Sequence, residues 1–264
     1  MRDELSRYRA PALDKGLDIL ELLAEHADGM SQADIAKALG RSPSELYRML
    51  DTLVRRGYVR RSAGDERLML GLKLFALATR HPPMRRLLQA ASEVTTQIAD
   101  TTLQSCHLSL YRDGNLFVAV QTDSPGRIGL SVRLGAAVDL LTTSSGLVML
   151  AFQSGERRAR MLAAHGAASI SAEAEKAMAS ALQAGHMERK SAQTVGVTDL
   201  AFPILGRTGD AVAAISLPYI EKLDPPGAPD VAACITALAQ GAAKLSADVP
   251  QDATFDEIAQ AAVA

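Results

Sequence analysis

The spacing of apolar residues predicts three helices followed by a hairpin in the first 70 positions. In the first helix, residues 12–26, apolar positions recur every three or four residues and would face the core: Leu13, Leu17, Leu20 and Leu23. A second helix over 32–39 and a third over 43–56 follow, separated by a very short turn. Residues 58–71 then alternate around a central glycine, as the two strands of a hairpin do.

Capping residues support the starts of the second and third helices. Ser31 can accept a hydrogen bond from the first turn of the second helix, with Asp34 three residues later. Ser42 precedes the third helix, Pro43 occupies its first position, and Glu45 completes the S-x-x-E capping box. The order of helix, short helix, tight turn, longer helix and hairpin predicts a winged helix-turn-helix. A small helical bundle with an amphipathic third helix is the alternative.

The rest of the chain predicts an α+β domain with a mainly antiparallel sheet, covered by helices on at least one side. Helices are expected near 84–102, 142–152, 155–165, 172–185 and 229–247, and strands near 106–122, 128–141, 194–206 and 211–220. The segment LKLFALATR reads as a linker helix that ends at the two prolines of HPP. The predicted domains are therefore a winged helix-turn-helix at 10–71, a linker at 72–83 and a second domain at 84–248.

Composition and charge narrow the class of protein. Apolar residues make up 48% of the chain and charged residues 22%, with no apolar run long enough to span a bilayer and no secretory signal, so a cytoplasmic protein without membrane contact is expected. Cys106 and Cys234 lie far apart in apolar contexts and predict buried reduced thiols. The net charge is −2, yet residues 41–80 hold nine basic side chains against four acidic ones, which indicates a DNA-facing surface in that segment.

Several segments together resemble one family closely. ILELLAEHADGMSQADIAKALG and YRMLDTLVRRGYV resemble the first helices and the recognition helix of IclR-type transcriptional regulators, and RLMLGLKLFALA resembles their wing strand and linker. GVTDLAFPILGRTGDAVAAISLP is similar to the family's signature in the second domain. The resemblance runs from about Leu13 to Ala247. It implies a GAF-like second domain that binds a small effector, and an assembly of dimers or dimers of dimers.

The third helix is the expected recognition helix, because its core stripe leaves Ser44, Glu45, Tyr47 and Arg48 exposed to a major groove. Arg48 is the candidate for a contact to a guanine edge or a phosphate. Glu45 departs from the family, which more often has a hydroxyl residue there; it is expected to cap, with acceptance from a cytosine amine as the alternative. Further phosphate or minor-groove contacts are expected from one or two of three wing residues: Arg60, Arg61 and Arg67.

The effector site is expected at the start of the apolar helix near 144. Hydroxyl side chains and free helix-start amides form a plausible cradle for a carboxylate, while ordinary N-capping is the alternative reading. The cradle comprises Thr142, Thr143, Ser144, Ser145 and Gly146. The resemblance adds further pocket positions: Leu140, Arg189, Thr198, Asp199 and Ser216. This chain departs from the family in having Leu147 after Gly146, where a lysine is frequent, and Pro218 in place of a second serine.

The sequence therefore predicts a DNA-binding transcriptional regulator whose operator affinity responds to a small organic acid, aromatic acids included. Its expected partners are a pseudo-palindromic operator and a second copy of the chain. A catalytic second domain is the first alternative, with Ser144 or Ser145 as nucleophile and His107, His165 or His186 as base, but no nucleophile elbow or triad order is present. The second alternative is a winged helix used only for protein contacts. No cofactor or metal site is expected, since no phosphate loop, dinucleotide motif or metal-ligand spacing occurs.

Overall fold

The structure, a computed structural model, describes residues 10–62, 64–78, 82–223 and 227–248 of the 264-residue chain. It divides between Pro82 and Pro83 into two compact units, and each unit is described by itself. Position 63 in the predicted wing turn and positions 79–81 in the predicted linker lie outside the described residues. None of the helices in the described ranges combines the length and the apolar composition that crossing a bilayer requires.

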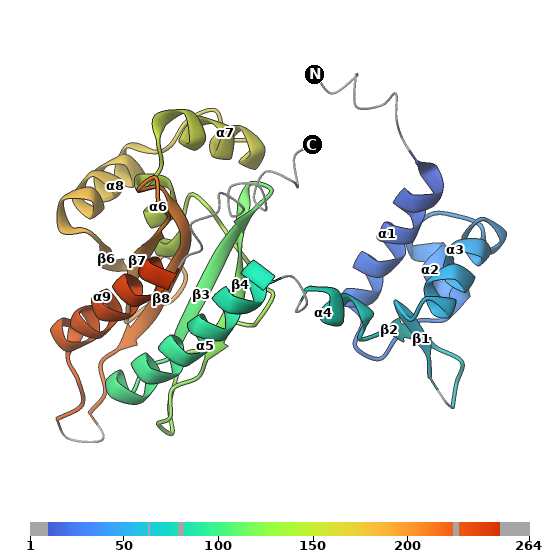
Figure 1. Cartoon of the computed structure of the whole chain (residues 1–264), viewed down its shortest axis with the longest axis horizontal. Helices are drawn as coiled ribbons and strands as arrows, with labels where there is room; N and C mark the ends of the chain where they lie inside the picture. Colours follow the sequence, from blue (N-terminus) through green and yellow to red (C-terminus); the bar gives the residue numbers. More distant parts are fainter. Residues whose placement is uncertain (1–9, 63, 79–81, 224–226, 249–264) are drawn as a thin grey trace. The chain divides into compact units, whose positions relative to one another are not determined.

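The first unit is a winged helix-turn-helix, as predicted (Figure 1). Its elements are α1 (Pro11–Ala24), α2 (Gln32–Ala38), α3 (Pro43–Arg55), β1 (Val59–Arg61), β2 (Leu68–Leu70) and α4 (Lys73–Ala78). The two strands pair antiparallel, with Arg60 opposite Met69. The change from helical to alternating spacing of apolar residues thus marks the true start of the wing.

Local hydrogen bonds explain where α2 and α3 begin. The Asp34 amide donates to the Ser31 hydroxyl over 3.1 Å, which satisfies one donor of the first turn of α2. At α3, the Glu45 carboxylate accepts from both the amide and the hydroxyl of Ser42, each over 3.0 Å, and Pro43 occupies the first turn. Both helix starts are those that the sequence predicted.

The core of the first unit corrects the predicted face of α1. Leu13 and Leu17 were expected to be buried, but their side chains are 62% and 47% exposed. Ile19, which the prediction omitted, is fully buried. The helix packs on α3 through the stripe that contains Ile19, Leu20 and Leu23, so a second apolar stripe beside it stays open to solvent.

The second unit is an α+β domain built on an antiparallel sheet, in agreement with the predicted class. Its strands are β3 (Cys106–Arg112), β4 (Asn115–Thr122), β5 (Ala137–Val138), β6 (Met187–Lys190), β7 (Val197–Leu205) and β8 (Ala211–Ile220). They are arranged in the order β5-β4-β3-β8-β7-β6, and every neighbouring pair is antiparallel. The helices are α5 (Pro82–Thr102), α6 (Ser144–Ala151), α7 (Gly155–His165), α8 (Ala172–Ala184) and α9 (Val231–Asp248).

Two parts of this sheet differ from the prediction. Residues 128–141 were expected to continue the sheet, but only Ala137 and Val138 pair with β4. Gly135 adopts a left-handed φ of +78° just before that strand, which turns the chain, and the preceding alternating residues lie beside a cavity instead of pairing. The edge strand β6 was not predicted, and it pairs with β7.

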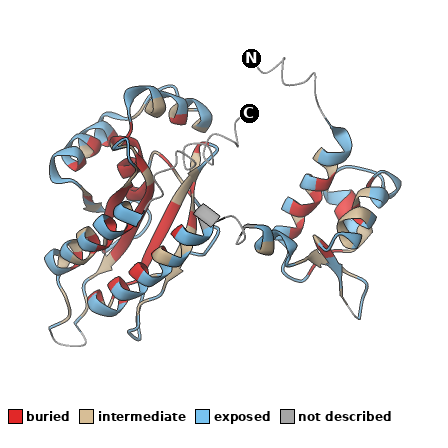
Figure 2. Ribbon diagram, viewed as in Figure 1, coloured by how far each residue is buried: buried red, intermediate tan, exposed pale blue. Residues whose placement is uncertain are grey.

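Helices cover both faces of the sheet, and the two faces have different compositions. Figure 2 shows buried residues along the central strands of the sheet and on helices that pack against it. On the side of α5 and α9, β3 and β8 present large apolar residues such as Leu108, Ile215 and Leu217. On the opposite side, where α6 packs on β7 and β8, β3 and β8 present polar residues that include His107 and Ser216. All eight residues of α6 are buried. A cavity of the second unit lies on this more polar face.

Candidate DNA-binding surface and effector cavity

The outward face of α3 exposes the predicted recognition residues. Ser44, Glu45, Tyr47 and Arg48 are all exposed, and the Tyr47 side chain reaches 58%. Arg48 forms no ion pair with another described residue, and Leu46 on the opposite side of the helix is fully buried. The Ser44 hydroxyl lies 3.1 Å from the Ser42 hydroxyl, within hydrogen-bond distance. An exposed helix that presents a phenol and a guanidinium group fits the width of a major groove.

Glu45 is engaged within the protein. Besides the two hydrogen bonds from Ser42, its carboxylate lies 3.3 Å from the ammonium group of Lys15 on α1. The Ser42 amide and hydroxyl, followed by Lys15, lower the pKa of Glu45 to about 2, so the side chain is ionised at neutral pH. The capping role, one of the two that the sequence left open, is present in the structure.

The three arginines of the wing differ in whether they form an ion pair. Arg61 lies 3.0 Å from Glu66, and Arg67 lies 3.9 Å from Asp65. Arg60 is exposed and forms no ion pair with another described residue. Exposed ion pairs contribute little free energy, so Arg61 and Arg67 can still exchange their carboxylate partners for a phosphate. Arg60 can bind a phosphate without breaking an ion pair.

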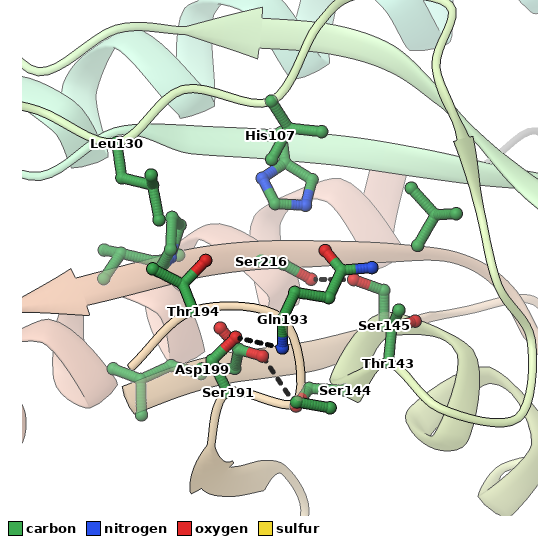
Figure 3. Close-up of a pocket in the computed structure, with 16 residues that line it drawn as sticks. His107, Leu130, Thr143, Ser144, Ser145, Ser191, Gln193, Thr194, Asp199 and Ser216 are labelled. Carbon is green, nitrogen blue, oxygen red and sulfur yellow. Dashed lines mark hydrogen bonds between the residues drawn. The ribbon is translucent and has the colours of Figure 1, made fainter. Parts of the chain in front are cut away.

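A cavity of about 80 Å³ lies between the start of α6 and the polar face of the sheet (Figure 3). Five of the predicted effector residues line it: Thr143, Ser144, Ser145, Asp199 and Ser216. They come from three separate elements, the 143–145 turn, β7 and β8, which the fold brings together. The cavity is closed on another side by residues 191–194, which precede β7.

The first turn of α6 presents unpaired donors to this cavity. Thr143 is the N-cap: its hydroxyl accepts from the Gly146 amide over 3.1 Å and donates to the Asp139 carbonyl over 2.7 Å. The amides of Ser144 and Ser145 therefore begin the helix without an intrahelical acceptor. The sequence left capping and anion binding as alternative roles for this segment. The geometry accommodates both, because the Thr143 hydroxyl caps the helix while the amides of Ser144 and Ser145 remain available to an anion.

Hydroxyl groups link α6 to the sheet. The Ser145 and Ser216 hydroxyl oxygens lie 2.8 Å apart, and the Ser144 hydroxyl donates to Asp199 over 3.4 Å. Burial raises the pKa of Asp199 above its ordinary value, although the hydroxyls of Ser191 and Ser144 and the charge of Arg189 act in the opposite direction. The protonated, neutral form of Asp199 is therefore more accessible than that of an exposed aspartate.

The other predicted effector residues do not line the cavity: Leu140, Thr142, Gly146, Arg189 and Thr198. The Thr142 hydroxyl donates to Asp139 over 2.7 Å, and Thr198 accepts from Lys190 over 3.4 Å. Arg189 lies 3.8 Å from Glu173 on α8. Among the described residues that do line the cavity, none is a lysine or an arginine.

Several lining residues were not predicted as effector contacts: His107, Leu130, Val132, Val138 and residues 191–194. His107 was considered only as a hypothetical catalytic base. One signal for it was present, since His107 stands between the apolar Cys106 and Leu108 on the same strand face as the small polar Ser109. The segments around 130 and 191 carried no comparable signal.

Comparison with known proteins identifies the family. The family model described as "IclR helix-turn-helix domain" matches residues 12–63. The family model described as "Bacterial transcriptional regulator IclR C-terminal" matches residues 84–243. The chain belongs to the IclR family. Members of this family are transcriptional regulators and not enzymes, so the catalytic alternative does not hold.

Curated relatives and solved structures agree with this IclR assignment. The chain is 24% identical to the HTH-type transcriptional regulator KdgR of Escherichia coli, over 78% of this chain and 80% of the relative. It is 25% identical to the glycerol operon regulatory protein of Streptomyces griseus, over 90% and 96%. An IclR homologue from Microbacterium hydrocarbonoxydans complexed with 4-hydroxybenzoate shares the fold with a TM-score of 0.74 at 20% identity, over 90% of this chain and 98% of that one.

Proposed function

We propose that this IclR-family regulator binds a pseudo-palindromic operator as a homodimer and that a small organic acid in the α6 cavity changes its operator affinity. The observation that supports the effector-binding part of this proposal is the first turn of α6, whose Ser144 and Ser145 line a partly enclosed cavity. Residues 10–71 would hold the DNA-binding function, 72–83 the connection and 84–248 the effector site. Since operator DNA lies in the bacterial cytoplasm, the regulator acts there.

The exposed face of α3 supports base reading by Ser44, Tyr47 and Arg48, and the wing supports backbone contacts. An Arg48→Ala variant should lose about 1–3 kcal/mol of discrimination between operator and random DNA. An Arg60→Ala variant should weaken both equally and flatten the salt slope by about 0.9. Arg112→Ala removes an exposed cation from the second unit and is the control. Equal losses on both DNAs for Arg48→Ala would contradict base reading.

The helix start supports an acid as the effector. Helix N-termini favour anions because their unpaired amides and the helix dipole point toward the ligand. A neutral Asp199 can donate a hydrogen bond to a bound carboxylate, so its burial is compatible with an anion nearby. The related structure that holds 4-hydroxybenzoate is an instance of an acid bound within the same fold.

The size of the cavity favours short acids over aromatic ones. Its volume of about 80 Å³ is well below the roughly 150 Å³ of an engineered cavity that binds benzene. Acids of three or four carbons therefore fit the cavity in its present form, whereas an aromatic acid requires residues 191–194, of which 192–194 are exposed, to move outward.

Calorimetry on single serine variants tests the effector site. Ser144→Ala and Ser145→Ala should both weaken acid binding, by about 3- to 10-fold for each lost hydrogen bond. Ser109→Ala is the matched control, because Ser109 is a buried serine of the same sheet face that does not line the cavity. Unchanged affinity in both test variants would place the effector elsewhere.

An apolar groove on the first unit supports dimerisation. Leu13, Leu17 and Leu77, from α1 and α4, line it and are 42–62% exposed. Pairing this face with the same face of a second copy would bury it and present two recognition helices to a two-fold symmetric operator. Pairs of such dimers are the larger assembly we propose. The effector then acts by binding one arrangement of the assembly more tightly than another.

A further inference from the structure

His107 is the buried polar group of the cavity that the proposed contacts leave unused. It lies on the central strand β3, opposite Ser216 of β8, and its imidazole points into the cavity (Figure 3). The residue is only 6% exposed, and its Nδ1 has no hydrogen-bond partner in the part of the chain that the structure describes. Buried polar atoms are nearly always paired, so an unpaired one beside a cavity indicates a missing partner.

In the structure, none of the described groups around His107 supplies that partner. The Ser216 hydroxyl is engaged with Ser145, and Asp199 accepts from Ser144. Across the other neighbouring strand, His107 lies opposite Gln121, whose side-chain amide donates to the Thr122 carbonyl and to Asp123. The Gln121 Oε1 is itself buried without a partner, so neither strand neighbour bonds the imidazole among the described residues. A molecule in the cavity can supply the missing hydrogen bond.

The chemistry of an uncharged imidazole limits what that molecule presents. Burial lowers the pKa of His107 to about 4, so at neutral pH the ring has one donor and one acceptor nitrogen. A hydroxyl group can donate to the acceptor nitrogen or accept from the N–H, so it satisfies either tautomer. A second carboxylate at this position would meet an uncharged ring, with no lysine or arginine among the described lining residues to balance its charge.

We propose that His107 is an effector-binding residue that reads a hydroxyl group, and that the effector is consequently a hydroxy acid. This inference rests on the proposed acid site: the carboxylate lies at the first turn of α6, and the hydroxyl lies against β3. His107 would make the site selective for hydroxy acids over unsubstituted acids, because an acid without the hydroxyl leaves the imidazole unpaired in the bound state.

Matched pairs of acids test the proposal by calorimetry on the full chain. The pairs are lactate with propionate, 3-hydroxybutyrate with butyrate, and 4-hydroxybenzoate with benzoate. In at least one pair the hydroxy acid should bind about 3- to 10-fold more tightly than its partner. His107→Leu removes the nitrogens at similar volume and should abolish this preference, whereas His107→Gln restores a donor and an acceptor and should retain part of it. Ser109→Ala, in the same strand and on the same face, should retain all of it.

A nitrogen-15 spectrum of the wild-type imidazoles keeps the test independent of variant folding. The His107 ring signals should shift on titration with the preferred hydroxy acid and not with its unsubstituted partner. Equal affinities within every pair, or a preference that survives in His107→Leu, would overturn the role of His107 while leaving the acid site intact. If no acid of any pair binds a chain that still shifts operator DNA, the acid effector fails, and the hydroxy acid fails with it.

Discussion

Gly146 offers a sharp test of how α6 reaches the cavity. Sequence reasoning placed this glycine among the ligand contacts, but its backbone lies against the turn that precedes the helix. A Cβ at Gly146 would lie 2.7 Å from the Asp139 carbonyl oxygen and 2.6 Å from the Leu140 carbonyl carbon. Both are backbone atoms, so no side chain can rotate away. We therefore predict that Gly146→Ala forces the helix start and the 139–140 backbone apart.

The size of the effect follows from these distances. Ordinary contacts of a Cβ begin near 3.4 Å, so the backbone must shift by about 0.7 Å or more. Overpacking in a tight interior costs about 1–3 kcal/mol, and a clash against backbone lies at the upper end. A loss of about 3 kcal/mol corresponds to a fall in Tm of roughly 6–12 °C for a domain of this size.

Differential scanning calorimetry of the full chain, supported by urea unfolding, measures this loss. Gly155→Ala is the matched control, because Gly155 is the first residue of α7 and nothing lies within 4 Å of its added Cβ. That control should be neutral or stabilise by about 0.5 kcal/mol, since alanine restricts the unfolded chain. A Gly146→Ala protein as stable as the Gly155→Ala protein would refute the close-approach argument.

Three further outcomes follow from the same structure. Because burial raises the pKa of Asp199, acid effectors should bind wild-type protein more tightly as pH falls, and Asp199→Asn should abolish that dependence in calorimetry between pH 5 and 8. Leu17→Glu should shift the dimer toward monomer in analytical ultracentrifugation, whereas Leu182→Glu, an equally exposed leucine of α8 outside the groove, should not. Burial raises the thiol pKa of Cys106 and, to about 11, that of Cys234, so neither should react with Ellman's reagent before denaturation; rapid reaction in native protein would contradict this.

The raised pKa of Asp199 also affects the folding stability of the second unit. A carboxyl whose folded pKa lies above its unfolded value loses folding stability as pH rises through the interval between the two values. Asp199→Asn should therefore stabilise the second unit at neutral pH relative to wild type, and the difference should shrink toward acid pH. A variant that is less stable at neutral pH would show that the Ser144 and Ser191 hydroxyls outweigh the burial of this carboxylate.

Local signals made the first unit predictable in most respects. Ser31, Ser42 and Glu45 fix helix starts through contacts within three residues, which sequence spacing alone reveals. The prediction for α1 was confirmed for Leu20 and Leu23 and wrong for Leu13 and Leu17, because two adjacent apolar stripes exist and spacing does not say which one packs on α3. Leu13 and Leu17 belong to the stripe that the fold of one chain leaves exposed.

Only one wall of the cavity could be predicted from the sequence alone. That wall is a continuous segment, whereas the opposite wall is formed by residues that only the folded sheet brings together. The wall formed by Ser144 and Ser145 is contiguous in sequence and starts a helix, so its donors could be recognised directly. The opposite wall depends on which face of the sheet α6 covers, and this is set by the pairing of β3 with β8. His107 becomes a cavity residue only through that pairing. Arg189 was assigned by resemblance, yet in the structure its partner is Glu173.

The contrast between the two faces of the sheet explains why the cavity exists where it does. Large residues such as Leu108 and Ile215 fill the space toward α5 and α9, and close packing there leaves no room for a ligand. Toward α6 the same strands carry His107 and Ser216 beside the cavity, and the small Ser216 side chain leaves space between the sheet and the helix start. Burying polar groups on that face costs stability unless they are paired. Since the apolar face can supply the stability of the domain, the opposite face can keep an unpaired imidazole available for a ligand.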